Sequence, residues 1–530
     1  MRVPVTPPLA EPRWRLSRDQ VLALVTVLVV ATGTVLRLRA VLAAPGVLYP
    51  DETYQMTEAA HRVVFGYGIT PWEFEQGLRS WLGPGLLLPP TALGGVLGLD
   101  GLHLTMLVRA WVVLGSAVGA GAAAVAARRL AGPVAGLLAA ALVAFSPVLA
   151  VYDVHPLADT VAAPLPVLAL ALLLTRSRRE FPASVAAGGL LAASVALRPQ
   201  AGVLVLGLVA AAVLGRSRPR VLGLLAGLAG GALLTGVLDL LAWGVPFAPE
   251  WRSVTFNVVE GGADTWGRQP PTFYADHLAH LLGPLPAAVV VLGLAAALLP
   301  FRDPVPAPVP AWPVVLGVLG FVGVLSLIGH KELRFVLPAL PIAAALGAAG
   351  VVRAVRRPAV TASAAVSVAV AGAVVMPGIR MSDLGYPGDA RSAWTIDPAT
   401  PRLLSVAGSL PEVCGVALVS ERLTWSGGYS ALHRDVPLGQ IRVASDAAGY
   451  PAWADALVVG AGRPLPAQYR VVAVSGAGVL AVRDGGCARA PAGVRARVLP
   501  RPPLTSPLSD RSASRPRDPD AHETRRAREM

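Results

Sequence analysis

Charged residues are scarce in this chain. Asp, Glu, Lys and Arg together make up 15% of its 530 residues, whereas hydrophobic residues make up 54%, and the mean hydropathy is +0.60. A soluble globular protein has about 25% charged residues. The shortage excludes an ordinary soluble protein and favours one that lies in a membrane.

Lysine is almost absent, since Lys331 is the only one in the chain. Arginine supplies the other fixed positive charges, beside an excess of Ala, Val, Leu, Gly and Pro. This composition is typical of a GC-rich bacterial genome and favours a bacterial plasma membrane. The formal net charge of +13 lies in short clusters between apolar runs and not on one basic face, so no nucleic-acid partner is expected.

Apolar runs that suit membrane helices recur along the chain. A span needs about 20 apolar residues. The first run, 20–43, follows the arginine-containing segment 1–19 and is too long for a signal peptide. The others lie at 105–127, 131–151, 160–175, 183–197, 200–215, 221–243, 281–300, 312–329, 334–352 and 359–377. We therefore expect an all-α polytopic domain over 20–377, with about eleven transmembrane helices.

Every second junction between these runs is rich in arginine. These junctions contain Arg128–Arg129, 176–179, 216–220, Arg302 and 353–357. Because cytoplasmic loops collect positive charge, we predict that they face the cytoplasm and that the N-terminus does too. The remaining junctions, including the loops 44–85 and 244–280, should face outward. The stretch 86–100 is short and contains Gly and Pro, which suits a re-entrant or interfacial segment; if it spans, the assignment fails downstream.

The pattern changes after Pro377. Short alternating apolar runs over 378–499 predict a small extracytoplasmic α/β domain, and the Pro-, Ser-, Arg- and Asp-rich tail 500–530 is expected to be disordered. The only two cysteines, Cys414 and Cys487, fall in the predicted α/β domain. A disulfide between them is permitted outside the cytoplasm, and the alternative is two unpaired thiols.

An acidic pair, Asp51-Glu52, follows the first predicted span within a few residues. Ionisable groups so close to the membrane are costly unless they are solvated or used, so the pair is either a catalytic candidate or an ordinary loop acid. The same loop interleaves aromatic and charged residues, as expected for binding a sugar and a phosphate, or for an interfacial aromatic belt. Its binding candidates are Gln55, Trp72, Glu73, Arg79 and Trp81.

A second group of charges lies in the turn before the tenth run. His330, Lys331 and Arg334 stand together at an outward junction, where the distribution of positive charge in membrane proteins does not favour them. They are candidates for binding a local anion such as a phosphate, with Arg79 and Arg198 behind them. The alternative is a snorkelling interfacial cluster.

Three stretches that contain these residues resemble the mannosyltransferase family that uses dolichyl-phosphate mannose, glycosyltransferase family 22. They read YPDETYQ from Tyr49, FGYGITPWEFEQGLRSW from Phe65 and GHKELRFVLPALP from Gly329. The resemblance covers residues 20–345 and is greatest to the GPI third-mannose transferase group. Tyr49 stands where the family has histidine, Phe74 where it has tryptophan, and 269–271 read Gln-Pro-Pro where it has His-Pro-Trp, which leaves the acceptor open.

This resemblance implies the glycosyltransferase C superfold and transfer of mannose, with inversion, from a polyprenyl-phosphate mannose to a lipid-linked or glycan acceptor. A carboxylate would take the proton of the acceptor hydroxyl, and Asp51 is the candidate. Glu52 would orient the acceptor or tune Asp51. The leaving lipid phosphate is already stable as an anion, so fixed cations suffice.

No cofactor is indicated. The only Asp-x-Asp spacing, Asp518-Pro519-Asp520, falls in the predicted tail, so a divalent metal is possible but not indicated. Two alternatives stay open: a lipid or glycan transporter or flippase, which also needs many spans and intramembrane charges, and a transferase of another sugar in the same superfold.

Overall fold

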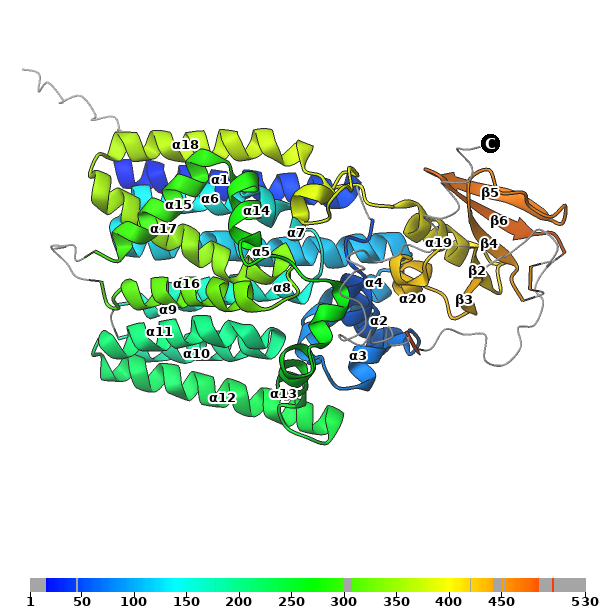
Figure 1. The fold of residues 1–530 in the computed structure, drawn as a ribbon, viewed down its shortest axis with the longest axis horizontal. Helices are drawn as coiled ribbons and strands as arrows, with labels where there is room; N and C mark the ends of the chain where they lie inside the picture. The colour runs from blue at the N-terminus through cyan, green and yellow to red at the C-terminus, as the bar shows by residue number, and fades with distance from the viewer. Residues whose placement is uncertain are drawn as a thin grey trace, which may run out of the picture.

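The computed structural model describes residues 16–43, 46–176, 178–299, 307–419, 421–441, 450–451, 453–485 and 498–499. A bundle of helices occupies the first three quarters of the described chain, and a smaller sheet domain lies at one end of it (Figure 1). The predicted fold class, a polytopic helical protein with a small C-terminal α/β domain, is confirmed.

Among the described residues, six helical segments are long and apolar enough to cross a membrane. They are α1 (Arg18–Ala43), α5 (Gly101–Ala131), α10 (Glu180–Leu197), α12 (Arg218–Trp243), η5 with α17 (Leu333–Ala339 and Leu340–Val355) and α18 with η6 (Pro358–Val375 and Met376–Gly378). The shorter apolar helices are α6 (Pro133–Ala144), α8 and α9 (Ala158–Ala162 and Pro164–Leu173), η2 and α11 (Pro199–Ala201 and Gly202–Leu214), α15 (Pro284–Ala297) and α16 (Trp312–Leu327). These segments correspond to the eleven predicted runs.

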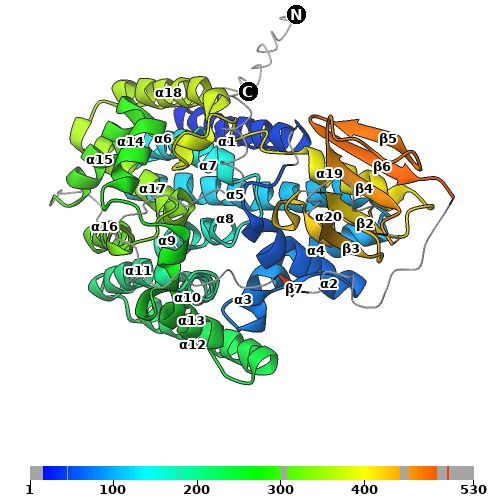
Figure 2. The same ribbon diagram turned by 45° about the vertical axis from the view of Figure 1, so that its right-hand side comes forward.

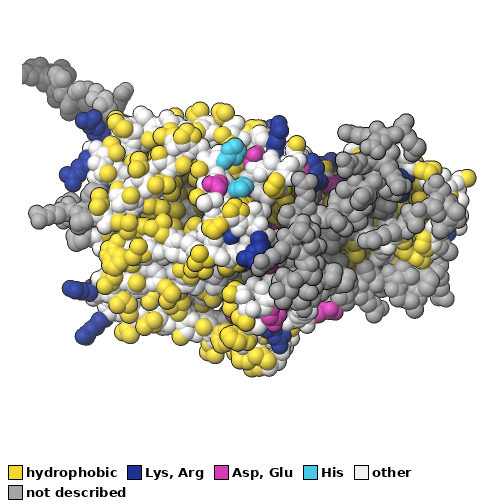
Figure 3. All heavy atoms as spheres, in the orientation of Figure 1, with side chains coloured by type: hydrophobic (Ala, Val, Ile, Leu, Met, Phe, Trp, Pro, Cys, Tyr) yellow, Lys and Arg dark blue, Asp and Glu magenta, His cyan; other side chains and the backbone are white. Residues whose placement is uncertain are grey.

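Hydrophobic side chains cover the flank of the bundle, and arginines gather at its end away from the sheet domain (Figure 3). That end carries the arginine-rich turns, except Arg302, which lies outside the described residues. The uncertain stretch 86–100 lies mostly in α4 (Leu82–Val96), a helix of 15 residues that packs on α2 (Glu58–Phe65) and α5.

One predicted span is interrupted. The run 131–151 forms α6 and then α7 (Pro147–Tyr152), because Ser146 caps a new helix and Pro147 cannot continue the old one. Arg37 of α1 fills the break: it donates hydrogen bonds to the carbonyl oxygens of Ala144 at 2.6 Å and Val143 at 3.2 Å, and its Nε is 2.8 Å from Oδ2 of Asp153. A buried arginine thus donates to carbonyls at the end of α6, where the break removes the next helical N–H donors.

In the described part of the sheet domain, five strands pair in the order β3-β2-β4-β6-β5. They are β2 (Val416–Val419), β3 (Leu438–Ile441), β4 (Ala456–Gly460), β5 (Tyr469–Ser475) and β6 (Gly478–Arg483). β2 is parallel to β3 and β4, whereas β6 is antiparallel to β4 and β5. Two helices, α19 (Ala399–Ser409) and α20 (Gly428–Leu432), accompany the sheet on the side of the bundle (Figure 2). Cys414 is disulfide-bonded, and Cys487 lies outside the described residues, so their pairing stays a prediction.

Helices α10 and α12 pack through glycines. A Cβ added to Gly227 would overlap the carbonyl oxygen of Val185, and one added to Gly188 would overlap that of Leu224. Small residues let membrane helices approach closely, which is where their packing energy arises.

Replacing Gly227 by leucine should therefore destabilise the bundle by about 1–3 kcal/mol, the usual cost of overpacking. Gly230 lies on the same helix with open space around its Cα, so Gly230→Leu is the matched control. Thermal unfolding of both variants in detergent measures the difference. Equal unfolding temperatures for the two variants would show that the α10–α12 contact does not limit stability.

Candidate active site

Segments from four predicted outward turns meet at the end of the bundle that faces the sheet domain. Asp51, Asp159, Arg198 and Arg334 belong to one network of ion pairs. Asp51 lies just before a π-helix, η1 (Glu52–Thr57), a rare helix type that often marks functional sites. The fold thus brings together Asp51, Arg198 and Arg334, which the sequence analysis placed in one site.

Arg334 is the centre of this network. Its Nη2 donates to Oδ2 of Asp51 at 2.6 Å, and its Nε donates to Oε2 of Glu332 at 2.5 Å. Oδ2 of Asp159 lies 3.9 Å from the same Nε and accepts a hydrogen bond from Arg198. The Arg334 side chain is 6% exposed and that of Asp51 is 25% exposed. In this pair it is therefore the carboxylate that a substrate can reach.

The charges around Asp51 keep it ionised. Burial alone would raise the pKa of Asp51, but the positive charges of Arg334 and Arg79 outweigh burial and lower it below the ordinary value. The pKa of Glu332 is lowered for the same reason, chiefly by Arg334. Both groups are carboxylates at neutral pH.

The arginines of the site hold unused hydrogen-bond donors. Within the described part of the chain, Nε of Arg79, Nε of Arg198 and Nη1 of Arg334 are buried and have no partner. A buried unsatisfied donor costs about 1–3 kcal/mol. Three of them in neighbouring guanidinium groups indicate a ligand that accepts hydrogen bonds, and an anionic oxygen ligand such as a phosphate fits.

Glu52 points to a different set of partners from Asp51. Its Oε1 accepts from the backbone N–H of Leu48 at 2.7 Å, and its Oε2 is 2.6 Å from Nδ1 of His155. Arg109 lies 3.4 Å away, and Glu52 is 1% exposed. The predicted contact of Glu52 with the acceptor stays a prediction, and these contacts favour a role in holding the loop.

Two polar candidates of the same loop lie beside Asp51. Nε2 of Gln55 donates to Oε1 of Glu73 at 3.1 Å. Burial raises the pKa of Glu73. The positive charge of Arg79 lowers this pKa, and the negative charge of Asp51 raises it further, so the net shift is upward. Asp51 and Glu73 are thus two neighbouring carboxyl groups with opposite pKa shifts, and this difference separates them experimentally.

The two predicted tryptophans lie in separate aromatic groups. Trp72 stacks on Trp266 with ring centroids 6.4 Å apart, and Trp266 lies 6.3 Å from the ring of His330. Trp81 instead packs on Phe74, at 4.9 Å. Trp72 therefore belongs to an aromatic group that reaches His330 through Trp266, whereas Trp81 packs on Phe74 of its own loop.

Lys331 uses its ammonium group within the protein. Nζ donates to the carbonyl oxygens of Ile328 at 2.5 Å, Gln269 at 2.9 Å and Gly329 at 3.5 Å. An ammonium group has three donors. The predicted contact of Lys331 with a donor phosphate stays a prediction, and it requires Lys331 to release at least one of these carbonyls.

Four further residues of the site were not predicted from the sequence. Asp159, Glu332, His155 and Arg109 each contact a predicted residue. Asp159 and His155 lie in a turn that the arginine pattern placed outward, and Glu332 lies inside the third motif. For these three residues the position was therefore a visible signal, whereas Arg109 lies inside the predicted span 105–127. The contact partners of all four residues were not visible in the sequence.

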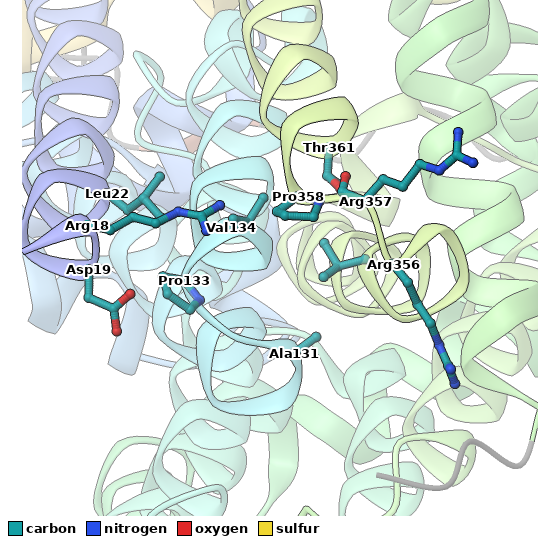
Figure 4. Close-up of a pocket in the computed structure, with 11 residues that line it drawn as sticks. Arg18, Asp19, Leu22, Ala131, Pro133, Val134, Arg356, Arg357, Pro358 and Thr361 are labelled. Carbon is teal, nitrogen blue, oxygen red and sulfur yellow. The ribbon is translucent and has the colours of Figure 1, made fainter. Parts of the chain in front are cut away.

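A hollow of about 290 Å³ lies at the opposite, arginine-rich end of the bundle. Arg18 of α1, Pro133 of α6, Arg356 at the end of α17 and Pro358 of α18 are among the residues that line it (Figure 4). None of the predicted site residues lines this hollow. Among the described residues, no group of three or more His, Cys, Asp or Glu is placed to hold a metal ion.

Known proteins share sequence with parts of this chain. GPI mannosyltransferase 3 of Yarrowia lipolytica is 30% identical over 306 residues, which cover 55% of this chain and 56% of that protein. The Dol-P-Man:Man(7)GlcNAc(2)-PP-Dol alpha-1,6-mannosyltransferase of Saccharomyces cerevisiae is 32% identical over 124 residues, 23% of this chain and 21% of that protein. The match thus spans little more than half the length of the first of these relatives and about a fifth of the second.

A solved structure shares the fold. The crystal structure of ArnT from Cupriavidus metallidurans bound to undecaprenyl phosphate aligns with a TM-score of 0.54 at 15% identity, over 88% of this chain and 98% of ArnT. At this identity the likeness concerns the fold alone, and it agrees with the predicted superfold.

The family comparison covers most of the chain, because the model of the Alg9-like mannosyltransferase family matches residues 29–381. This range contains the Asp51 loop, Arg198 and the His330–Arg334 turn. The chain belongs to the Alg9-like mannosyltransferase family.

Proposed function

We propose that this chain is a membrane mannosyltransferase that moves mannose from a polyprenyl-phosphate mannose to the hydroxyl of a lipid-linked or glycan acceptor. The observation that carries the proposal is the reachable, ionised Asp51 beside guanidinium groups with unused buried donors. Such a site offers a base to an incoming hydroxyl and an anion site to a departing phosphate. Family membership supports mannose as the sugar.

The reaction needs one proton acceptor and one anion site. The acceptor oxygen attacks the anomeric carbon of the donor while its proton moves to Asp51. The bond from that carbon to the phosphate oxygen breaks, and its electron pair leaves with the lipid phosphate. Attack from the face opposite the phosphate inverts the configuration, as in inverting glycosidases.

Charge balance links donor binding to the base. Asp51, Asp159 and Glu332 face Arg79, Arg198 and Arg334, so the charges of these six groups balance without a ligand, and the raised pKa of the neighbouring Glu73 favours its neutral form. A donor phosphate would add negative charge and compete with Asp51 for Arg334. Each hydrogen bond that Arg334 transfers to the phosphate frees Asp51 to receive a proton.

The remaining predicted residues have supporting places in this scheme. Gln55, Glu73 and Trp72 form the side of the site where an acceptor sugar would find hydrogen bonds and an aromatic face. Lys331 would hold the 266–269 loop, and with it Trp266, against the site. Asp159 and Glu332 would orient the guanidinium groups of Arg198 and Arg334.

The site would lie on the non-cytoplasmic side. The arginine-rich turns mark the other end of the bundle as cytoplasmic, and the codon-driven shortage of lysine favours a bacterial plasma membrane. The apolar flank would hold the polyprenyl chain of the donor and surrounding lipids while its phosphate reaches the outer end.

Purified protein in detergent should transfer mannose from a synthetic polyprenyl-phosphate mannose to a short α-mannoside, and the product should carry a new α-linkage. GDP-mannose and polyprenyl-phosphate glucose serve as control donors. Transfer from GDP-mannose, or none from any polyprenyl-phosphate mannose by protein that unfolds cooperatively, would contradict the proposed donor.

The pH dependence of kcat/KM for the donor reports on the free enzyme. Because the base must be deprotonated and the pKa of Asp51 is lowered, activity should persist as the pH falls to about 4, the ordinary pKa of an aspartate. If the base were a group with a raised pKa, such as Glu73, the falling pH would reduce activity while the pH is still above about 4.3, the ordinary pKa of a glutamate. Glu73→Gln is the matched variant: it should leave the acid limb in place, and disappearance of the limb would assign the base to Glu73.

A further inference from the structure

The segment that follows Asp51 is packed into the sheet domain. Tyr54 of η1 and Ile69 belong to the same buried cluster as Leu403, Leu418 and Leu432 of that domain. Tyr54 is 1% exposed, and its hydroxyl donates to the carbonyl oxygen of Leu423. Figures 1 and 2 show α2 and α20 side by side at this junction. The loop that carries the acid pair therefore contributes to the core of a domain outside the matched family range.

Glu58 makes the densest polar contact between the two parts. It is fully buried, and its carboxylate accepts hydrogen bonds from the backbone N–H groups of Tyr429 at 3.1 Å and Ser430 at 2.8 Å. The Ser430 hydroxyl donates at 2.6 Å, and the N–H of Ile69 donates at 2.9 Å. One side chain of α2 is thus bound to α20 and to the end of its own loop.

A second contact lies one helical turn further on. Nε2 of His61 is 3.0 Å from Nδ1 of His433, the residue that ends α20. Gly428 begins α20 at a φ of +58°, and a Cβ there would lie 3.0 Å from Oε2 of Glu58. The two surfaces leave little room for α20 to shift against α2.

The residues from Asp51 to Glu58 bind partners in two different parts of the molecule. Asp51 pairs with Arg334 and Glu52 with His155, both in the bundle, whereas Tyr54 and Glu58 bind the sheet domain. The short helix between them is therefore held at both ends by different parts of the molecule. A π-helix is less stable than an α-helix and persists where its surroundings determine it.

We propose that Glu58 is a positioning residue for Asp51, and that the sheet domain is part of the scaffold that sets the base against the donor. This inference rests on the proposed role of Asp51. Glu58 touches no substrate in this scheme; it acts by fixing η1 relative to Arg334.

The inference predicts a specific kinetic pattern. Of the three guanidinium groups that would bind the donor phosphate, those of Arg198 and Arg334 lie on elements that Glu58 does not contact. Arg79 follows α3 (Trp72–Glu75), further along the loop than the contacts of Glu58. The base, in contrast, lies directly before η1, next to the helix that Glu58 holds. Loss of the Glu58 contacts should therefore lower kcat without raising the donor KM. A merely structural role would lower the amount of active protein without separating these two quantities.

Glu58→Gln tests this pattern, because glutamine keeps the size but opposes an amide N–H₂ group to donors. A misplacement of about 1 Å can cost on the order of 100-fold in rate, so kcat per donor-binding site should fall by about 10- to 100-fold, with the donor KM no more than twofold above the wild type. Glu75→Gln makes the same change at an exposed position of the same loop and should leave both values unchanged. A kcat for Glu58→Gln within twofold of the control, or a parallel rise in donor KM, would overturn the inference.

Two further measurements keep the test decisive. If Glu58→Gln does not fold, Ser430→Ala and Tyr54→Phe take its place. Each removes one contact between the outer loop and the sheet domain, and each should lower kcat. Hydrogen exchange of residues 50–57 needs no turnover: it should accelerate in these variants but not in Glu75→Gln. Faster exchange in a protein without mannosyl transfer would reject the proposed function but support the positioning role of Glu58. Unchanged exchange would reject that positioning role.

Discussion

The buried guanidinium group of Arg334 is the interaction on which the site depends. It lies within reach of Asp51, Glu332 and Asp159 and packs 4.4 Å from the ring centroid of Tyr49. A buried charge is tolerated only when it is paired, and removing one partner of such a pair costs about 3–5 kcal/mol. The outer loop, the turn after α7 and η5 must therefore converge for the fold to be stable. The same convergence assembles the chemistry.

This balance explains how one cluster can serve both binding and reaction. The three carboxylates and three guanidinium groups balance in charge, yet three buried guanidinium N–H groups have no partner among the described residues. These six groups are thus balanced in charge but not satisfied in hydrogen bonding, and an anionic oxygen ligand would accept the unused hydrogen bonds. In the proposed scheme, that ligand weakens the hold of Arg334 on Asp51 at the moment when a base is needed.

The sequence predicted the features that depend on local composition. Apolar length predicted the spans, and the predicted arginine-rich turns lie at one end of the bundle. Asp51, Arg198 and Arg334, which stand at predicted outward junctions, lie together in the structure, and their roles stay predictions. The sequence did not predict the break at Ser146–Pro147, because a span of constant hydropathy hides it, although the Ser-Pro pair was a visible signal. It also missed the partners of Lys331 and Glu58. These hydrogen-bond partners depend on tertiary packing between residues as distant in the sequence as Glu58 and Ser430. A single sequence does not show such contacts.

The most direct test of the account is the single-turnover rate of mannosyl transfer by Asp51→Asn with donor already bound, beside the wild type. Asparagine keeps the shape but cannot take a proton, so the rate should fall by about 10²- to 10⁴-fold, the usual contribution of a general base. Donor binding should be retained, because Arg334 is no longer held by Asp51. A rate within tenfold of the wild type would contradict the central claim that the carboxylate beside Arg334 is the base.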